Sequence, residues 1–290
     1  MTGTAGSMAA IRTPAGKRTP VPLRLVRLAR LALHLVHGLL IVRLRFPGLS
    51  ESERDRRKLG WSRKMLSILS ISVRDQDAHR KLPERCMLVL NHISWLDMFV
   101  VNARHPATFI AKSEIRSWPL IGPLCTGAGT LYIERGTRAG ALRARQAIAR
   151  AIECGTLAAF FPEGTTTYGR SLGRFHAALF QPALDAAAVL QPAALRYVDA
   201  AGMHTDAAAY AGESSFMESV WAVVSTRSIV AEVRFLEPLS TIGQTRRSLA
   251  ENAEALIAAA LGLPVPERTS RSGHPRRAPD TAAGPPDGSR

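Results

Sequence analysis

The chain has 290 residues, of which 46% are apolar and 6% aromatic, and its 38 Lys and Arg against 23 Asp and Glu give a formal net charge of +15. This length and apolar content suffice for a core of ordinary size, which excludes a disulfide-stapled mini-protein and a wholly disordered chain. Three widely spaced cysteines without a C-x-x-C pair support neither a disulfide framework nor a zinc cluster, and they fit a reducing, cytosol-facing location.

The positive charge is concentrated in the N-terminal part of the chain. Residues 1–80 hold 16 basic and 5 acidic residues, whereas residues 81–263 and 264–290 each have a net charge of only +2. This distribution predicts a local anionic partner. A nucleic acid is the weaker competitor for that role, because the basic residues alternate with long aliphatic ones and no nucleic-acid reader motif accompanies them. We therefore expect membrane lipids as partners and no nucleic acid.

Residues 1–20 have the composition of a disordered tail, and residues 21–80 that of a membrane-associating helical region. The uncharged run 31–42 is shorter than the roughly 20 residues that a membrane-crossing helix needs, so shallow insertion, a span with snorkelling arginines and a buried core helix all stay open. After Pro47 and Gly48, residues 54–69 mix basic and apolar side chains at helical spacing. This pattern fits a helix in the lipid headgroup layer or a solvated helix packed on its own domain.

Residues 81–263 alternate short β-prone runs with helix-like stretches, which predicts an α/β domain with a mixed central sheet flanked by helices. The expected strands are 86–90, 108–111, 130–133, 157–161, 189–195 and 229–235. The expected helices are 95–104, 137–153, 175–187, 214–224 and 245–261. Pro192 predicts that its strand is short or lies at an edge of the sheet. Residues 264–290 are expected to be a second disordered tail.

The first polar cluster, Asn91 to Asp97, directly follows the apolar run 86–90. If the chain turns into a helix after the strand, Asp97 can accept the Nδ1 proton of His92 and leave Nε2 available to take a proton from a substrate hydroxyl. That arrangement is a general base with an orienting carboxylate and no protein nucleophile. A structural histidine with a capping aspartate explains the same spacing.

Three further clusters accompany it. Phe161 to Arg170 reads F-P-E-G-T-T-T-Y-G-R, in which Gly164 allows backbone N–H groups to approach an anion and the threonines add hydroxyl groups. The block 129–136 places Arg135 at a strand end, where a surface ion pair with Glu134 is the alternative interpretation. The fourth cluster is the proline-containing run 189–194. Polar groups after strands are typical of the ligand crevice of an α/β sheet.

These four clusters, in this order and at these separations, resemble the glycerolipid acyltransferase family that includes the 1-acylglycerol-3-phosphate acyltransferases. The H-x4-D box is similar to 92–97, the arginine-bearing block to 129–136, F-P-E-G-T to 161–165 and the proline block to 190–192. The resemblance covers motifs within about residues 85–200. It implies an enzyme that transfers a fatty acyl chain from acyl-CoA or acyl-carrier protein, used as a co-substrate without any cofactor or metal, to the free hydroxyl of a lysolipid.

The resemblance also implies roles for individual residues. His92 would be the general base and Asp97 its orienting partner. Glu163, Gly164 and Thr165 would shape the pocket for the acceptor headgroup. Arg135 and Lys112 would bind the phosphate of that headgroup, and Thr166 would be a further substrate-binding residue. Family members act at membranes, so we expect this one at the cytoplasmic face of the inner membrane.

Position 166 departs from the family pattern. Many members that act on a phosphate monoester carry Arg there, and Thr166 cannot reproduce the bidentate grip of a guanidinium group. Arg170 or Arg174 can take over that role. The first expectation is 1-acyl-sn-glycerol-3-phosphate as the acceptor, with lyso-ornithine lipid or another lysophospholipid as the alternative. A non-catalytic protein that scaffolds a lipid surface is the alternative of a different class.

Overall fold

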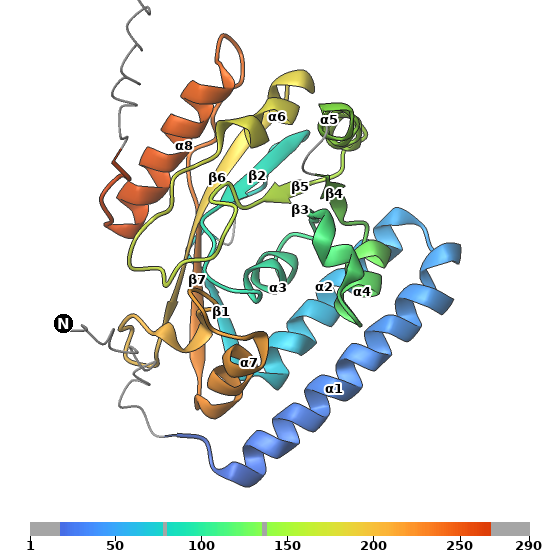
Figure 1. The fold of residues 1–290 in the computed structure, drawn as a ribbon, viewed down its shortest axis with the longest axis vertical. Helices are drawn as coiled ribbons and strands as arrows, with labels where there is room; N and C mark the ends of the chain where they lie inside the picture. The colour runs from blue at the N-terminus through green and yellow to red at the C-terminus, as the bar shows by residue number, and fades with distance from the viewer. Residues whose placement is uncertain (1–17, 78–79, 135–137, 268–290) are drawn as a thin grey trace, which may run out of the picture.

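The computed structural model describes residues 18–77, 80–134 and 138–267 (Figure 1). Its centre is a seven-stranded sheet in the order β1-β7-β6-β2-β5-β3-β4. The strands are β1 (Ile71–Asp75), β2 (Cys86–Leu90), β3 (Thr108–Lys112), β4 (Leu131–Ile133), β5 (Ala158–Phe160), β6 (Val189–Val198) and β7 (Ile229–Phe235). The pair β6–β7 is antiparallel and the other pairs are parallel, which confirms the predicted mixed sheet.

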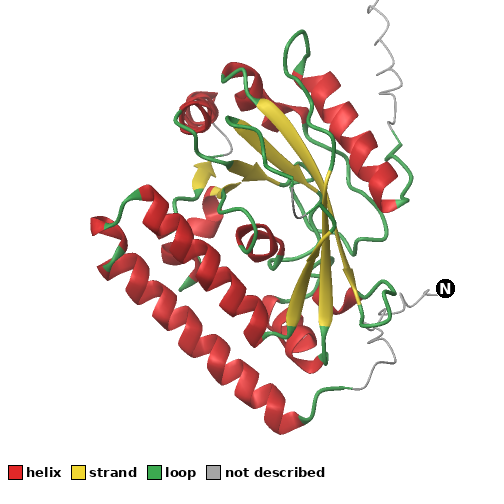
Figure 2. Cartoon of the chain, turned by 180° about the vertical axis from the view of Figure 1, so that it is seen from behind, coloured by secondary structure: helices red, strands yellow, loops and turns green. Residues whose placement is uncertain are grey.

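Helices cover both faces of this sheet (Figures 1 and 2). The helices are α1 (Val21–Leu44), α2 (Glu51–Ile68), α3 (Asp97–Asn102), α4 (Ile121–Gly127), α5 (Arg138–Glu153), α6 (Gln181–Asp185), α7 (Phe216–Ser225) and α8 (Arg246–Leu261). Four short 3-10 turns lie at 46–48, 113–117, 177–180 and 206–208. One core cluster joins the sheet to α1, α2, α3 and α7, and the other joins it to α5, α6 and α8. The strands β2 and β5 are wholly buried because both faces are covered, as continuous apolar runs require.

Two features of the sheet differ from the prediction. The expectation of a short or edge strand at Pro192 is wrong, because β6 has ten residues and lies between β7 and β2. The ladder between β6 and β7 starts at Ala193, one residue beyond the proline, so the missing N–H of Pro192 interrupts no β6–β7 register pair. The strand β1 was not predicted. It pairs with β7. The sheet therefore includes residues from the expected helical region 21–80 as well as from the α/β domain expected at 81–263.

The helix α1 packs on the domain along one face. Arg27, Leu31, His34 and Gly38 recur at intervals of three or four residues and are its buried residues. The guanidinium group of Arg27 donates to the hydroxyl groups of residues 19 and 70 and to the carbonyl groups of residues 224, 226 and 227. Further along, the ring of His34 stacks on the ring of Trp61 at 4.6 Å. These contacts hold α1 against α2 and the end of α7.

Candidate active site

Three neighbouring parallel strands end at one edge of the sheet with polar side chains. β2 leads into His92, β5 leads to Glu163 three residues after its last residue, and β3 ends at Lys112. The carboxyl ends of parallel strands meet at a common edge, where α/β sheets place their ligands. The strand order therefore brings the first and second polar clusters together.

Asp97 forms the centre of a dense hydrogen-bond network. Its Oδ2 accepts from Nδ1 of His92 at 2.8 Å and from the backbone N–H groups of Ile93 and Ser94 at 2.7 and 3.0 Å. Its Oδ1 accepts from the hydroxyl group of Tyr197 at 2.8 Å. The side chain of Asp97 is fully buried, and buried carboxylates are stable only when several donors satisfy them. Asp97 therefore fixes the orientation of the His92 ring.

The other nitrogen of His92, Nε2, takes no part in the network around Asp97. Because Nδ1 donates to a carboxylate, Nε2 is the nitrogen that carries the lone pair of a neutral ring. The side chain is 21% exposed, and no hydrogen bond to Nε2 occurs among the described residues. The ring lies flat on Phe161, with 4.0 Å between the ring centres and 5° between the planes. This geometry lets Nε2 take a proton from a ligand.

The Pro-Glu-Gly turn is attached to the backbone of His92 on both sides. Oε1 of Glu163 accepts from the N–H of His92 at 2.6 Å, and the N–H of Thr167 donates to the carbonyl oxygen of His92 at 2.8 Å. Oε2 of Glu163 accepts from the N–H of Gly173 at 2.6 Å. A Cβ atom at Gly173 would lie 2.7 Å from that oxygen, so the close approach requires glycine. Gly164 has a φ of +69° and turns the chain back over the strand end.

Burial gives Glu163 unusual acid–base properties. The residue is 4% exposed, and the loss of water raises the pKa of its carboxyl group to about 7. The backbone N–H groups of His92 and Gly173 act in the opposite direction because they favour the charged form. Burial also raises the pKa of Tyr197 well above its usual value, so this phenol stays protonated and donates to Asp97.

The remaining predicted residues do not all lie beside His92 and Glu163. Lys112 is exposed at the end of β3, and Thr165 is exposed in the turn after Gly164. The hydroxyl group of Thr166 donates to the carbonyl oxygen of Tyr210, which directs it toward that segment. Arg135 lies outside the described residues. Of the two alternative cations, Arg170 binds both oxygens of Asp206, and the other, residue 174, lines a different cavity.

An apolar cavity lies on the α1 side of the site. Its lining comes from α1, α2, α3, α4 and β3 and includes Gly38, Trp61, Leu124 and Phe109. The ring of Phe109 stacks on Phe161 at 5.6 Å, and Phe161 in turn stacks on His92. A line of aromatic rings thus connects the cavity with the imidazole.

Sequence reasoning missed three residues of the site: Tyr197, Phe161 as an aromatic support, and Asn91. The side-chain amide of Asn91 exchanges two hydrogen bonds with the backbone of Leu195 and joins the end of β2 to β6. A tyrosine within an apolar run carries a usable signal, because its hydroxyl group needs a partner when it is buried.

Comparison with known proteins agrees with this geometry. The Acyltransferase family profile matches residues 70–196. A 1-acyl-sn-glycerol-3-phosphate acyltransferase of Neisseria meningitidis is 36% identical over 73% of this chain and 83% of its own length. A lyso-ornithine lipid O-acyltransferase of Pseudomonas aeruginosa is 34% identical over 86% and 95%. The crystal structure of a 1-acyl-sn-glycerophosphate acyltransferase from Thermotoga maritima has the same fold, with a TM-score of 0.63 at 16% identity over 83% of this chain and 94% of that one.

Proposed function

Because the chain belongs to the glycerolipid acyltransferase family and is an O-acyltransferase, we propose that it acylates 1-acyl-sn-glycerol-3-phosphate to give phosphatidate. The acyl donor is a thioester, either acyl-CoA or acyl-carrier protein. The observation that carries this proposal is the hydrogen-bonded pair of His92 and the buried Asp97 at the edge where β2 and β5 end. A non-catalytic scaffold has no use for such a pair.

In the proposed reaction, Nε2 of His92 removes the proton from the free hydroxyl group of the lysolipid. The oxygen attacks the thioester carbonyl carbon and forms a tetrahedral intermediate. Asp97 stabilises the imidazolium ion that forms. The C–S bond then breaks, and the thiolate leaves as a thiol after it takes the proton from His92. No acyl-enzyme is formed.

The acceptor headgroup is assigned to the side of the edge that carries Glu163, Gly164 and Thr165, with Lys112 and Arg135 for its phosphate. Lys112 supports this assignment because it ends β3, the strand next to β5, and its side chain is exposed. The acyl chain of the donor is assigned to the apolar cavity beside Phe109, since burial of methylene groups there is favourable by about 0.8 kcal/mol each.

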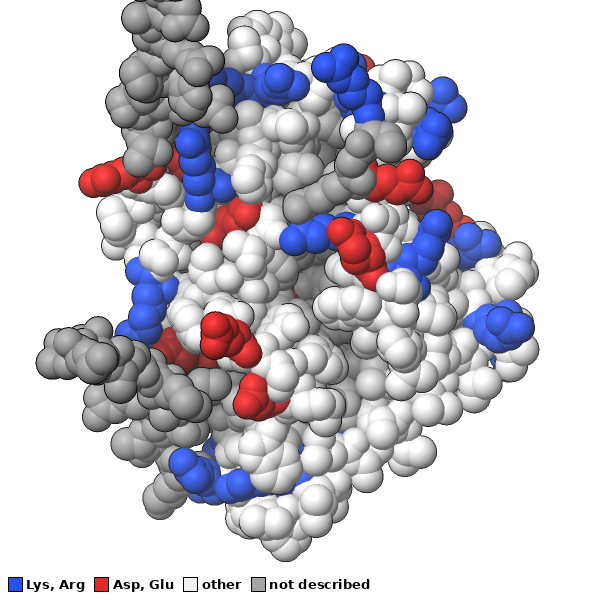
Figure 3. Space-filling model, in the orientation of Figure 1, with Lys and Arg blue, Asp and Glu red and all other residues white. Residues whose placement is uncertain are grey.

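We assign the apolar outer side of α1 to the membrane interface at the cytoplasmic leaflet of the inner membrane. By length and composition α1 is capable of crossing a bilayer, yet its bonds through Arg27 hold it along the domain. Leu33 and Leu44 are each 70% exposed, and Met217 on the adjoining α7 is 67% exposed. Figure 3 shows a largely uncharged surface over α1 and α4, with basic side chains at its margins and acidic side chains beside α7. Such margins suit an anionic leaflet.

Lyso-ornithine lipid is the second candidate acceptor. The relative from Pseudomonas aeruginosa aligns with 86% of this chain, more than the 73% covered by the Neisseria protein. The contact of Thr166 with Tyr210 also leaves position 166 without a group that grips a phosphate monoester.

A parallel acylation assay tests the proposal. Purified protein is given acyl-CoA or acyl-carrier protein with either lysophosphatidate or lyso-ornithine lipid, and the acylated products are separated. We expect phosphatidate as the main product. Acylation of lyso-ornithine lipid alone would replace the first acceptor by the second, and no product with either lipid would contradict both.

A further inference from the structure

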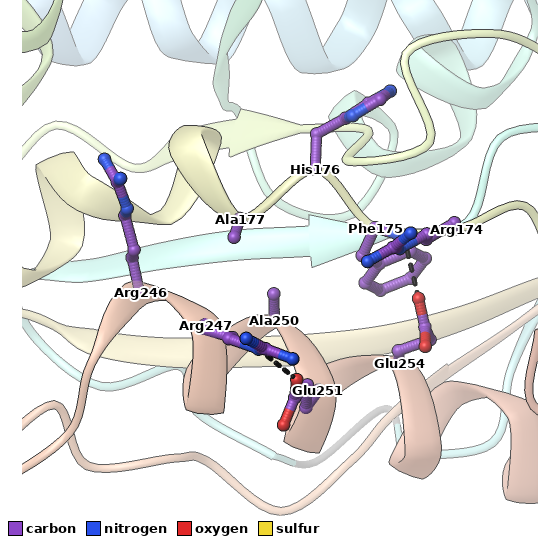
Figure 4. Close-up of a pocket in the computed structure, with 9 residues that line it drawn as sticks. All are labelled: Arg174, Phe175, His176, Ala177, Arg246, Arg247, Ala250, Glu251 and Glu254. Carbon is purple, nitrogen blue, oxygen red and sulfur yellow. Dashed lines mark hydrogen bonds and ion pairs between the residues drawn. The ribbon is translucent and has the colours of Figure 1, made fainter. Parts of the chain in front are cut away.

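A second cavity, of about 520 Å³, lies on the α8 side of the sheet. It is formed by the segment 174–177 and the first half of α8, and Figure 1 shows α8 and α1 on opposite sides of the sheet. Phe175, Ala177 and Ala250 give it an apolar floor (Figure 4). This cavity, called the α8 cavity below, therefore faces away from the surface assigned to lipid.

Four basic side chains and the acidic side chains of Glu251 and Glu254 surround this floor. Arg174 and His176 come from the segment after the Pro-Glu-Gly turn, and Arg246 comes from the first residue of α8; all three are exposed. Arg247 also lines the cavity and forms an ion pair with Glu251 at 3.0 Å. Figure 4 shows Arg174 and Arg246 at opposite ends of the cavity, with His176 above the floor. Guanidinium groups that reach into one cavity from two separate elements suit an anion.

The α8 cavity is connected to the catalytic edge through the backbone. The N–H of Gly173 binds Glu163, which in turn binds the N–H of His92. Two residues after Gly173, the N–H of Phe175 donates to Oε2 of the buried Glu254 at 2.7 Å. The segment that carries Arg174 is thus fixed between the active site and α8. In Figure 4 it lies beside the arrowhead of β2, the end from which the chain continues to His92.

We propose that the α8 cavity binds the phosphate of the acyl donor. This inference rests on the proposed function, which requires a thioester donor. Acyl-CoA and acyl-carrier protein both carry the acyl group on a phosphopantetheine arm, so a phosphate at the far end of that arm is their shared chemistry. Arg174 and Arg246 bind this phosphate, and the acyl chain occupies the cavity beside Phe109 on the other side of the sheet. The thioester then lies between them, at the edge where β2 leads into His92.

The test uses short donors that differ only in the phosphate. Acyl-pantetheine and acyl-4′-phosphopantetheine are given to the full chain and to the double variant R174A/R246A, with saturating lysolipid. We expect the wild-type protein to have a kcat/KM at least about 10-fold higher for the phosphorylated donor, as is typical of hydrogen bonds to a charged group. In the double variant this ratio falls to about 1, because only the phosphorylated donor loses a contact.

Two control variants accompany this measurement. R234A removes an exposed arginine of β7 that does not line the α8 cavity, and it keeps the wild-type ratio. R174K/R246K keeps the charge without the planar fork and has an intermediate ratio. Thermal unfolding of all variants shows that each is folded.

The outcomes separate this inference from the proposed function. An unchanged ratio in R174A/R246A, or equal use of both donors by the wild-type protein, overturns the inference while acyl transfer itself stands. Absence of transfer from every thioester by the wild-type protein contradicts the proposed function and the inference with it. The same double variant identifies which donor supplies the phosphate. If acyl-CoA is the donor, the variant has a raised KM for acyl-CoA. If acyl-carrier protein is the donor, the variant has a raised KM for acyl-carrier protein.

Discussion

The sheet edge that carries His92 and the helical face formed by the outer sides of α1 and α7 are built by different means. At the edge, the carboxylates of Asp97 and Glu163 accept six hydrogen bonds of 3.0 Å or shorter, four of them from backbone N–H groups. On the outer side of α1 and α7, exposed apolar side chains such as Leu33 and Met217 form one apolar surface without directional bonds. At the edge one substitution removes a specific hydrogen bond, whereas on the outer side of α1 and α7 many side chains each contribute a small part of one apolar surface.

The largest expected effect of a single substitution comes from His92→Ala. Loss of the general base lowers kcat by roughly 10³-fold, within the range usual for such catalysis. A radiolabelled acyl-transfer assay measures this, and liposome flotation of the same variant is expected to be unchanged. His37→Ala, on the exposed side of α1, is the control and retains activity. Substantial turnover by the His92 variant would contradict the assignment of His92 as the general base.

The next effect concerns stability and pH. The pKa of Glu163 is about 7 in the folded protein and about 4.5 in the unfolded chain, so the folded state binds the proton more tightly between these values. The free energy of unfolding therefore decreases as pH rises from 4.5 to 7, by on the order of 3 kcal/mol from this group. Urea unfolding at several pH values measures this decrease. In Glu163→Gln this part of the pH dependence is absent; identical slopes in both proteins would contradict the assigned pKa.

Tyr197→Phe gives a smaller effect at the edge. The phenylalanine ring fills the same space but leaves Oδ1 of Asp97 without its phenol donor, so we expect kcat to fall about 10-fold, the cost of one hydrogen bond to a charged group. The KM for both substrates stays unchanged because Tyr197 is fully buried and touches neither. When Tyr197→Phe is introduced into the Asp97→Asn variant, we expect a much smaller further fall in kcat. A merely structural role of Tyr197 does not predict this difference. Tyr132→Phe, which removes a hydroxyl group bonded to Thr126, is the matched control.

The smallest effect is expected on the helical face. Met217→Ser removes one exposed apolar side chain from α7, and partial immersion of such a side chain in lipid contributes about 1 kcal/mol. Binding to anionic liposomes should weaken about 5-fold, with unchanged activity in detergent micelles. Met203 is equally exposed, at 67%, in the turn after β6, and Met203→Ser should leave liposome binding intact. Equal losses in both variants would show that α7 has no special part in membrane contact.

The catalytic edge was largely predictable from the sequence. Strands β2 and β7 have the predicted bounds, and the predicted meeting of His92 with Asp97 and the Pro-Glu-Gly turn is confirmed by the hydrogen bonds. Short motifs after apolar strands carry this information because parallel neighbours place them at one edge. The catalytic and binding roles of these residues stay predictions.

The parts that were not predicted depend on partners distant in sequence. Tyr197 lies 100 residues from Asp97, and β1 is defined by pairing with a strand more than 150 residues later. The ten-residue length of β6 also depends on β7, whose antiparallel register begins only after Pro192. For α1, the buried face is set by acceptors of Arg27 near residue 225, which no local pattern reveals.

The bonds of Arg27 have a consequence for biosynthesis. Its carbonyl acceptors lie 197 to 200 residues further along the chain, so a ribosome that adds about 5–20 residues per second needs roughly 10–40 s to supply them after Arg27 itself. During this interval α1 has emerged while its docking site does not yet exist. Burial of apolar side chains in a bilayer is favourable, so we expect the nascent α1 to contact lipid before the sheet closes. The enzyme is therefore expected to complete its folding where it will work.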